Sequence, residues 1–139
     1  MTVLDTNVLS ELMRPLPSAA VEAWFRLQRS TELFTTSVTE AEIFYGIELL
    51  TKGKRREALL LSAEAMFRED LAGRVLSFDE QAARVFARIA AKRRAAGKPI
   101  SHADAQIAAM AHVRSATLAT RNVEDFSDCG IRVVDPWRT

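Results

Sequence analysis

The order of apolar and polar positions along the chain predicts strands that alternate with helices. Short apolar or β-branched runs are each followed by a longer stretch with apolar residues at helical spacing. The expected strands are residues 1–5, 33–36, 73–78, 116–120 and 131–134, and the expected helices are residues 7–13, 18–29, 37–50, 55–71, 79–94 and 101–114. Strands separated by helices pair in parallel through right-handed crossovers. The pattern therefore predicts a three-layer α/β fold, with a central parallel sheet of about five strands flanked by helices.

Residues that favour helix starts support these boundaries. Ser18 precedes an apolar-periodic stretch, as an N-cap does. Ser37 is followed three residues later by Glu40, and Ser101 is followed three residues later by Asp104, which is the spacing of a capping box. No repeat or linker interrupts the chain, and 139 residues are enough to bury one core. A single domain spanning residues 1–139 is expected.

Composition indicates a globular protein of a reducing compartment. Hydrophobic residues make up 48% of the chain and charged residues 27%, which is the balance of a folded domain. The net charge of +1 does not indicate a general nucleic-acid binder, so any basic surface must be local. Cys129 is the only cysteine, no apolar run has the length of a membrane span, and Asp5 lies where a signal peptide would be apolar. We expect a cytoplasmic protein without a membrane contact.

The first predicted strand ends at a carboxylate. Val3 and Leu4 form a short apolar run, Asp5 follows directly, and an apolar helical pattern begins at Val8. In open α/β sheets, ligands bind at the carboxyl ends of the strands. Asp5 is therefore a candidate site residue, although an aspartate in this position can also serve only as a helix cap.

Glu42 is expected on an apolar face of the helix predicted at residues 37–50. Val38, Tyr45 and Leu49 lie one turn before, one turn after and two turns after it. A carboxylate on a buried face must be protonated, paired with a cation or bound to a metal. An acid at the edge of an almost uniformly apolar helix is the alternative explanation.

Asp104 repeats this arrangement in the helix that Ser101 begins. Its helical neighbours Ile107, Ala108 and Ala111 are apolar and mostly small. An aspartate in the first turn also interacts well with the helix dipole, which explains the acid but not the apolar face on which it lies.

Three carboxylates that converge at one sheet edge would repel one another unless a cation joined them. Oxygen ligands, without histidine or cysteine at metal-binding spacing, select Mg²⁺ or Mn²⁺ over zinc. His102 and His112 are ten positions apart on one helix, which does not match a metal pair. Enzymes that cleave phosphodiester bonds commonly use Mg²⁺ ions that carboxylates hold.

Five segments, in order along the whole chain, resemble the PIN domain and, more narrowly, the VapC and FitB toxins of bacterial toxin–antitoxin pairs. They are Leu4-Asp5-Thr6-Asn7, Thr39-Glu40-Ala41-Glu42, Ser101-His102-Ala103-Asp104-Ala105, the run from Ala119 to Phe126, and Asp135-Pro136-Trp137. The resemblance implies a PIN-like three-layer fold and a Mg²⁺-dependent endoribonuclease, in which Mn²⁺ can substitute.

The resemblance also implies a role for each matched residue. Asp5 and Asp104 would be the principal metal ligands, and Glu42 would be the third catalytic acid, bound to metal directly or through water. Weaker or indirect roles are implied or expected for four residues that follow the first and fourth strands: Thr6, Thr120, Asn122 and Asp125. Many members of the family carry aspartate where Asn122 stands, which argues against a second tightly held ion.

Partners follow from the same resemblance. The chain would act as a toxin on RNA, would be neutralised by a small antitoxin, would reach DNA only through that antitoxin, and would form a homodimer. Trp24, Phe25 and apolar positions of the helix at 37–50 are candidate dimer contacts. Arg121, directly beside the predicted site, is the favoured RNA contact. Weaker basic candidates are the turn at 52–56 and Lys92, Arg93, Arg94 and Lys98.

Two other functions remain compatible with the sequence. An aspartyl-phosphate phosphatase could use Asp5 as nucleophile, but that chemistry usually needs a second aspartate two positions on, where this chain has Asn7. A catalytically inactive PIN-like module that binds RNA or protein is the other alternative, and the complete set of three acids argues against it.

Overall fold

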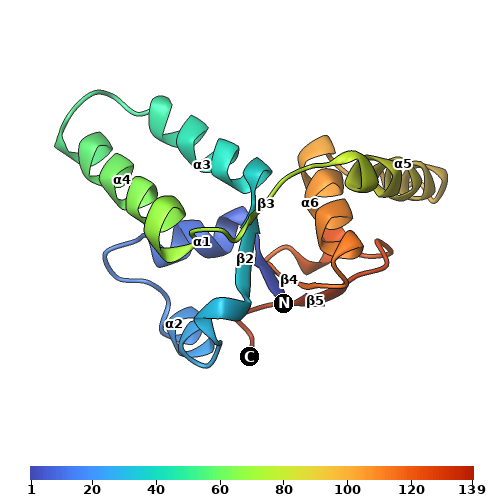
Figure 1. The fold of residues 1–139 in the computed structure, drawn as a ribbon, viewed down its shortest axis with the longest axis horizontal. Coiled ribbons are helices and arrows are strands. Elements are labelled where there is room, and N and C mark those ends of the chain that lie inside the picture. The colour runs from blue at the N-terminus through green and yellow to red at the C-terminus, as the bar shows by residue number, and fades with distance from the viewer.

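A computed structural model describes all 139 residues, and its strands and helices alternate as predicted (Figure 1). The strands are β1 (Thr2–Leu4), β2 (Leu33–Thr36), β3 (Val75–Leu76), β4 (Thr117–Ala119) and β5 (Arg132–Val134). The helices are α1 (Thr6–Leu12), α2 (Ala19–Arg26), α3 (Ser37–Glu48), α4 (Lys54–Ala65), α5 (Glu80–Ala95) and α6 (His102–Val113). Short helical turns η1 (Ser30–Glu32), η2 (Met66–Asp70) and η3 (Val123–Phe126) complete the chain. None of the helices has the length and apolarity needed to cross a membrane.

All five strands are parallel and lie in the order β3-β2-β1-β4-β5. The predicted parallel sheet is therefore confirmed. The chain builds outward from β1 through β2 to β3 and then returns to the other side of β1 with β4. The order reverses between β1 and β4, and ligands bind at such a switch point in open α/β sheets. Leu4 pairs with Ala119 there, so the next residues, Asp5 and Thr120, leave the sheet side by side.

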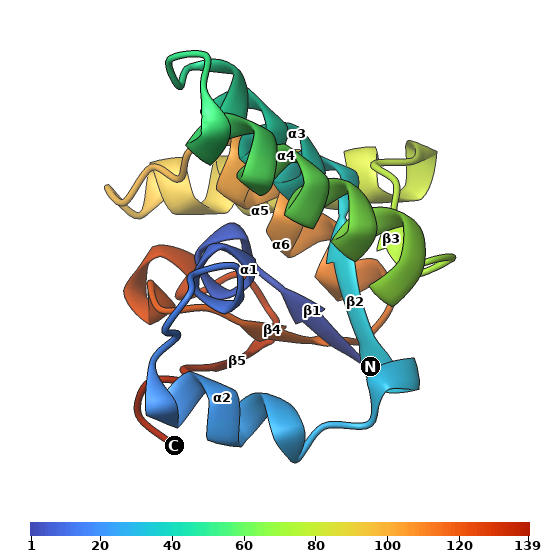
Figure 2. The same cartoon turned by 90° about the vertical axis from the view of Figure 1, so that its left-hand side faces the viewer.

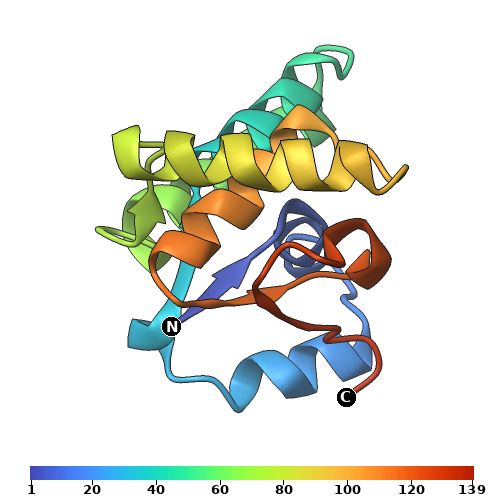
Figure 3. The same cartoon turned by 90° about the vertical axis from the view of Figure 1, so that its right-hand side faces the viewer.

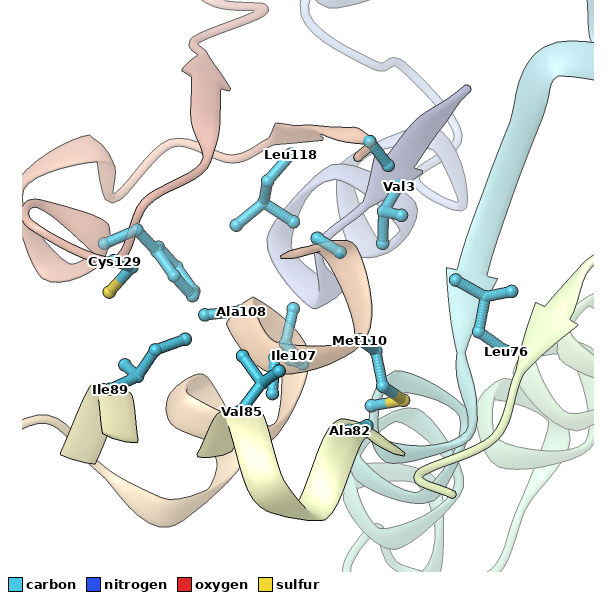
Figure 4. Packing of buried hydrophobic residues seen from close by; sticks show 14 residues of the cluster. Val3, Leu76, Ala82, Val85, Ile89, Ile107, Ala108, Met110, Leu118 and Cys129 are labelled. Carbon is cyan, nitrogen blue, oxygen red and sulfur yellow. The ribbon is translucent and has the colours of Figure 1, made fainter. Parts of the chain in front are cut away.

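Helices cover both faces of the sheet (Figures 1 and 3). Val3 and Leu118 point to one face, where they pack in one core with residues of α5 and α6, including Ile107 (Figure 4). Leu4 and Ala119, the next residue on each strand, point to the opposite core, which α1, α2, α3 and α4 supply. This alternation follows from the twofold period of a strand and fixes the direction in which both strand ends emerge.

Several predicted elements begin or end a few residues away from their expected bounds, and two differences concern how a helix continues or is capped. The helix expected at 55–71 is α-helical only to Ala65 and continues as the π-helical turn η2. The cap of α3 is Thr36 and not Ser37, because the Thr36 hydroxyl accepts the Thr39 backbone N–H at 3.1 Å. Figure 2 shows the hairpin of α3 and α4 at one end of the face that also carries α1 and α2, with α2 at the other end.

Candidate metal centre

Asp5 lies in a polar niche at the carboxyl end of β1 and is only 4% exposed. Its Oδ1 accepts the Thr6 backbone N–H at 2.8 Å, and its Oδ2 accepts the Thr120 hydroxyl at 2.7 Å. Burial raises the pKa of this carboxyl above its ordinary value, against the opposing effect of these hydrogen bonds. The carboxylate is thus held in one orientation, but its charge is not neutralised.

Thr6 connects Asp5 to Glu42. The Thr6 hydroxyl donates to Glu42 Oε1 at 2.7 Å and lies 3.1 Å from the hydroxyl of the buried Thr39. Glu42 itself is exposed. Helix α3 buries the stripe of Thr39, Ile43 and Ile47, and Glu42, one position before Ile43, therefore lies outside that stripe. The prediction that Glu42 lies on a buried apolar face was therefore wrong. Its side chain is nevertheless anchored toward Asp5.

Asp104 approaches the same space from the first turn of α6. The Ser101 hydroxyl caps this helix by accepting the Asp104 backbone N–H at 3.1 Å, as predicted. Ile107, Ala108 and Ala111 below it are fully buried. Burial raises the Asp104 pKa to about 6, and the negative charges of Asp5, Asp125 and Glu42 add to the increase. Three other acids therefore lie within electrostatic range of Asp104.

The donor set suits a divalent cation. None of Asp5, Glu42 and Asp104 forms an ion pair with a lysine or arginine. A buried carboxylate beside other carboxylates, without a basic partner, is stabilised when a cation binds. The three do not yet form a closed cluster: no group of three or more acidic, histidine or cysteine side chains is gathered tightly enough to enclose an ion. Binding would thus have to draw Asp104 or Glu42 toward the fixed Asp5.

Asn7 organises the ends of β1 and β4, a role that the sequence pattern did not predict. Its amide nitrogen donates to Thr120 Oγ1 at 3.2 Å and lies 3.4 Å from Asp5 Oδ2, while its oxygen accepts the Arg121 backbone N–H at 3.2 Å. Thr120 also accepts the Asn122 N–H at 3.1 Å. The motif Asp5-Thr6-Asn7 marks the site in the sequence, but two partners of Asn7, Thr120 and Arg121, lie more than 110 residues away, which a local pattern does not reveal.

Asn122 and Asp125 lie beside this site. Asn122 precedes the turn η3, and the Asp125 backbone N–H donates to its carbonyl at 3.1 Å. Asp125 is close enough for its charge to raise the Asp104 pKa. Arg121, also exposed, has its guanidinium carbon 5.0 Å from the centre of the Trp137 ring. The structure therefore gathers the predicted residues from β1, α3, α6 and the segment after β4.

Arg93, one of the basic candidates for RNA contact, is closed off from RNA because it is only 5% exposed. Its guanidinium donates to the carbonyl of Lys98 at 2.7 Å, of Asp125 at 2.7 Å and of Ser127 at 3.0 Å. Three backbone carbonyls thus take the place of a carboxylate partner. Arg93 ties the α5–α6 connection, which leads to Asp104, to the turn that carries Asp125.

Arg93→Met should lower the free energy of unfolding by about 3 kcal/mol, because buried carbonyls lose their donor. Urea denaturation of the natural chain and of Arg93→Met at the same pH measures the difference in the free energy of unfolding. Arg94→Met is the matched control, since Arg94 is exposed and has no side-chain partner, and it should change stability by less than about 0.5 kcal/mol. Equal effects at the two positions would show that the three hydrogen bonds contribute little.

Comparison with known proteins agrees with the fold and with the resemblance. The PIN domain family model matches residues 2–130. The plasmid stability protein StbB of Pseudomonas syringae pv. tomato is 41% identical over 137 residues, which cover 99% of each chain. The VapC ribonuclease Y4jK of Sinorhizobium fredii is 39% identical over 137 residues, covering 99% of this chain and 98% of its own. The crystal structure of FitAcB from Neisseria gonorrhoeae has a TM-score of 0.93 at 37% identity and covers 100% of both chains.

These matches extend over nearly the full length of the chain and include both sequence and architecture. The segments that carry the resemblance are the same segments that the fold brings to the switch point between β1 and β4. The chain belongs to the PIN domain family, among proteins of the VapC and FitB type.

Proposed function

We propose that this protein is a Mg²⁺-dependent endoribonuclease that acts in the cytoplasm as the toxin of a toxin–antitoxin pair. The observation that carries the proposal is the set of Asp5, Glu42 and Asp104, which face one space at the sheet switch point without any basic partner. Relatives named VapC ribonuclease and toxin FitB support the same function.

Bound Mg²⁺ would polarise the phosphoryl oxygen, activate a water molecule and stabilise the leaving oxygen. Asp5 and Asp104 would hold the ion. Thr120 and the Thr6 backbone fix both oxygens of Asp5, so this ligand needs no reorientation. The Thr6 hydroxyl fixes Glu42 Oε1, which leaves Oε2 for the ion or for one of its waters.

The proposed activity is tested with purified protein and a mixture of structured and single-stranded RNAs. Cleavage should require Mg²⁺ or Mn²⁺ and stop in EDTA, and internal cuts distinguish an endonuclease from an exonuclease. Equal cutting in EDTA would overturn the metal mechanism. RNA binding without cleavage at any metal concentration would favour the inactive binding module, and release of phosphate from aryl phosphates would favour the phosphatase.

One tightly held ion is expected, because the amide of Asn122 brings no charge to the site. Asn122→Asp should allow a second Mn²⁺ ion to bind, and calorimetric titration should then resolve two ions where the natural chain shows one. Asp125→Asn should reduce cleavage less than Asp104→Asn does, since Asp125 would act through water. Two equally tight ions in the natural chain would contradict this assignment.

Two exposed apolar surfaces are available for protein partners. A groove of about 870 Å³ lies between α1, α2 and α4, with Leu12, Met13 and Phe25 among its apolar lining and Arg26 and Arg74 among its charged lining. We assign it to the antitoxin, because an apolar floor with charged edges suits an amphipathic segment. The relative FitB of Neisseria gonorrhoeae is named a toxin, and a solved structure that shares the fold is titled as a member of the VapBC family of toxin–antitoxin systems.

The second surface is on α3, where Tyr45 and Leu49 are 66% and 68% exposed one turn apart. We assign it to the homodimer, since exposed apolar patches commonly mark interfaces. Trp24, which was a candidate dimer contact, is only 8% exposed and packs in the core. Phe25 lines the groove instead.

Substitutions on the two surfaces should have separate effects. Phe25→Asp should weaken binding of the co-expressed antitoxin about tenfold or more and leave dimerisation unchanged, whereas Leu49→Asp should produce a monomer that still binds antitoxin. Light scattering and calorimetry measure the two properties, and each variant is the control for the other. A natural chain that is monomeric at tens of micromolar would refute the homodimer, and unchanged antitoxin affinity in Phe25→Asp would refute the groove.

A further inference from the structure

A polar hollow adjoins the proposed metal centre at the carboxyl ends of β4 and β5. Its volume of about 570 Å³ lies within the roughly 300–1,000 Å³ of small-molecule sites. Asn122 and Asp125 line it, and the Asn122 backbone N–H donates to the Thr120 hydroxyl that in turn holds Asp5, so the hollow lies beside the metal centre. A nucleotide next to the cleaved bond is the part of an RNA strand that would reach it.

Arg121 supplies one wall of the hollow. Its guanidinium carbon lies 5.0 Å from the centre of the Trp137 ring, and its backbone N–H is fixed by Asn7. Trp137 therefore supports the guanidinium from one side, while the exposed remainder of Arg121 lines the hollow. A guanidinium plane is a surface on which unstacked RNA bases stack.

The charges of the hollow favour a base over a phosphate. Asp135 lies 3.7 Å from Arg138 and accepts the Trp137 N–H, so this acid is already engaged. Arg121 then faces two acids, Glu124 and Asp125, whose carboxylates have no hydrogen bond or ion pair within the chain. The side chains that line the hollow therefore carry a net charge of −1. This charge repels a phosphate group, whereas the free carboxylate oxygens can accept hydrogen bonds from N–H donors.

We propose that this hollow binds one unstacked guanine of single-stranded RNA, with the base on Arg121 and its Watson–Crick edge on Glu124. The two oxygens of a carboxylate accept two parallel N–H bonds, and guanine presents N1–H and N2–H side by side on that edge. Adenine and cytosine offer only an amino group, and uracil offers one N–H. We assign the base edge to Glu124 because Asp125 is the acid of the hollow that lies within electrostatic range of Asp104. This inference rests on the proposed ribonuclease function and adds a base preference to it.

Binding, measured without cleavage, tests the proposal. Labelled uridine hexaribonucleotides that carry one central guanine, adenine or cytosine are titrated in EDTA and followed by fluorescence anisotropy. The guanine oligomer should bind about tenfold more tightly than the others, the size expected of a bidentate contact. In a Trp24→Phe background, Trp137 is the only tryptophan, and its emission should change on binding the guanine oligomer.

Two variants locate the preference. Glu124→Gln should reduce the preference for guanine to about twofold while leaving the affinity for the other oligomers within about twofold. Asp128→Asn is the matched control, since it removes one exposed charge from the same segment outside the hollow, and it should keep the full preference. Arg121→Lys keeps the charge but loses the plane, so it should weaken binding of every oligomer.

Equal affinity for the three oligomers, or a full guanine preference in Glu124→Gln, would overturn the inference. These results are distinguishable from failure of the proposed function. RNA cleavage in Mg²⁺ without a base preference would leave the nuclease intact and remove the subsite. A guanine preference in a protein that never cleaves RNA would leave the subsite intact and remove the nuclease.

Discussion

Asp5→Asn and Asp104→Asn should each reduce RNA cleavage by at least about three orders of magnitude, or about 4 kcal/mol of transition-state stabilisation. Asparagine keeps the shape of the side chain but removes the charge that would hold the ion. Asp5 should tolerate the substitution less well than Asp104, because Thr6, Asn7 and Thr120 already fix the orientation of its carboxylate. Cleavage rates at saturating Mg²⁺, measured for each purified variant, give the comparison.

Loss of activity must occur without loss of fold. Circular dichroism and urea denaturation in EDTA should be native for both variants, since neither removes buried apolar surface. Asp128→Asn makes the same chemical change at an exposed acid and should keep nearly full activity. Glu42→Gln should also be severely impaired, because Glu42 faces Asp5 through Thr6. Residual activity within tenfold of the natural chain in Asp104→Asn would remove this residue from the metal centre.

Metal affinity should fall steeply as the pH drops below about 6. Burial and the neighbouring acids raise the Asp104 pKa to about 6 in the ion-free protein, so protons compete with the ion below that pH. The affinity should fall about tenfold per pH unit for one released proton, and more steeply if Asp5 also releases one. Calorimetric titration with Mn²⁺ at pH 5, 6 and 7.5 measures this slope. An affinity that does not change between pH 5 and 7.5 would contradict it.

Stability of the ion-free protein should change in the opposite direction. The folded chain holds the Asp104 proton more tightly than the unfolded chain, so the stabilisation is complete below about pH 4 and is lost as the pH rises through about 6. Because Asp104 is partly exposed, solvent screening reduces the effect to about 1 kcal/mol. Urea denaturation in EDTA at pH 5 and 7.5 should reveal it. Asp104→Asn should be less dependent on pH, and added Mg²⁺ should stabilise the natural chain most at the higher pH.

The sequence by itself determined the order of the strands and helices and the place of two of the three acids. These features depend on local signals: apolar runs with strand or helix period, and caps such as Ser101 within three residues of their partners. Because parallel strands end at one edge of a sheet, the strand pattern alone predicts that Asp5 and the segment after β4 lie together. The PIN resemblance then related Asp104 and Glu42 to the same site.

Only the tertiary structure decided which helical face is buried and where each long side chain goes. Glu42, Tyr45 and Leu49 are exposed, because contact of α3 with other helices buries the stripe one position away, at Thr39, Ile43 and Ile47. Arg93 belongs by sequence to a basic run, yet its side chain is buried and donates to backbone carbonyls as far as 34 residues along the chain. Asn7 joins strand ends more than 110 residues apart. Such contacts depend on distances through space, which the spacing of residues along one helix or strand does not encode.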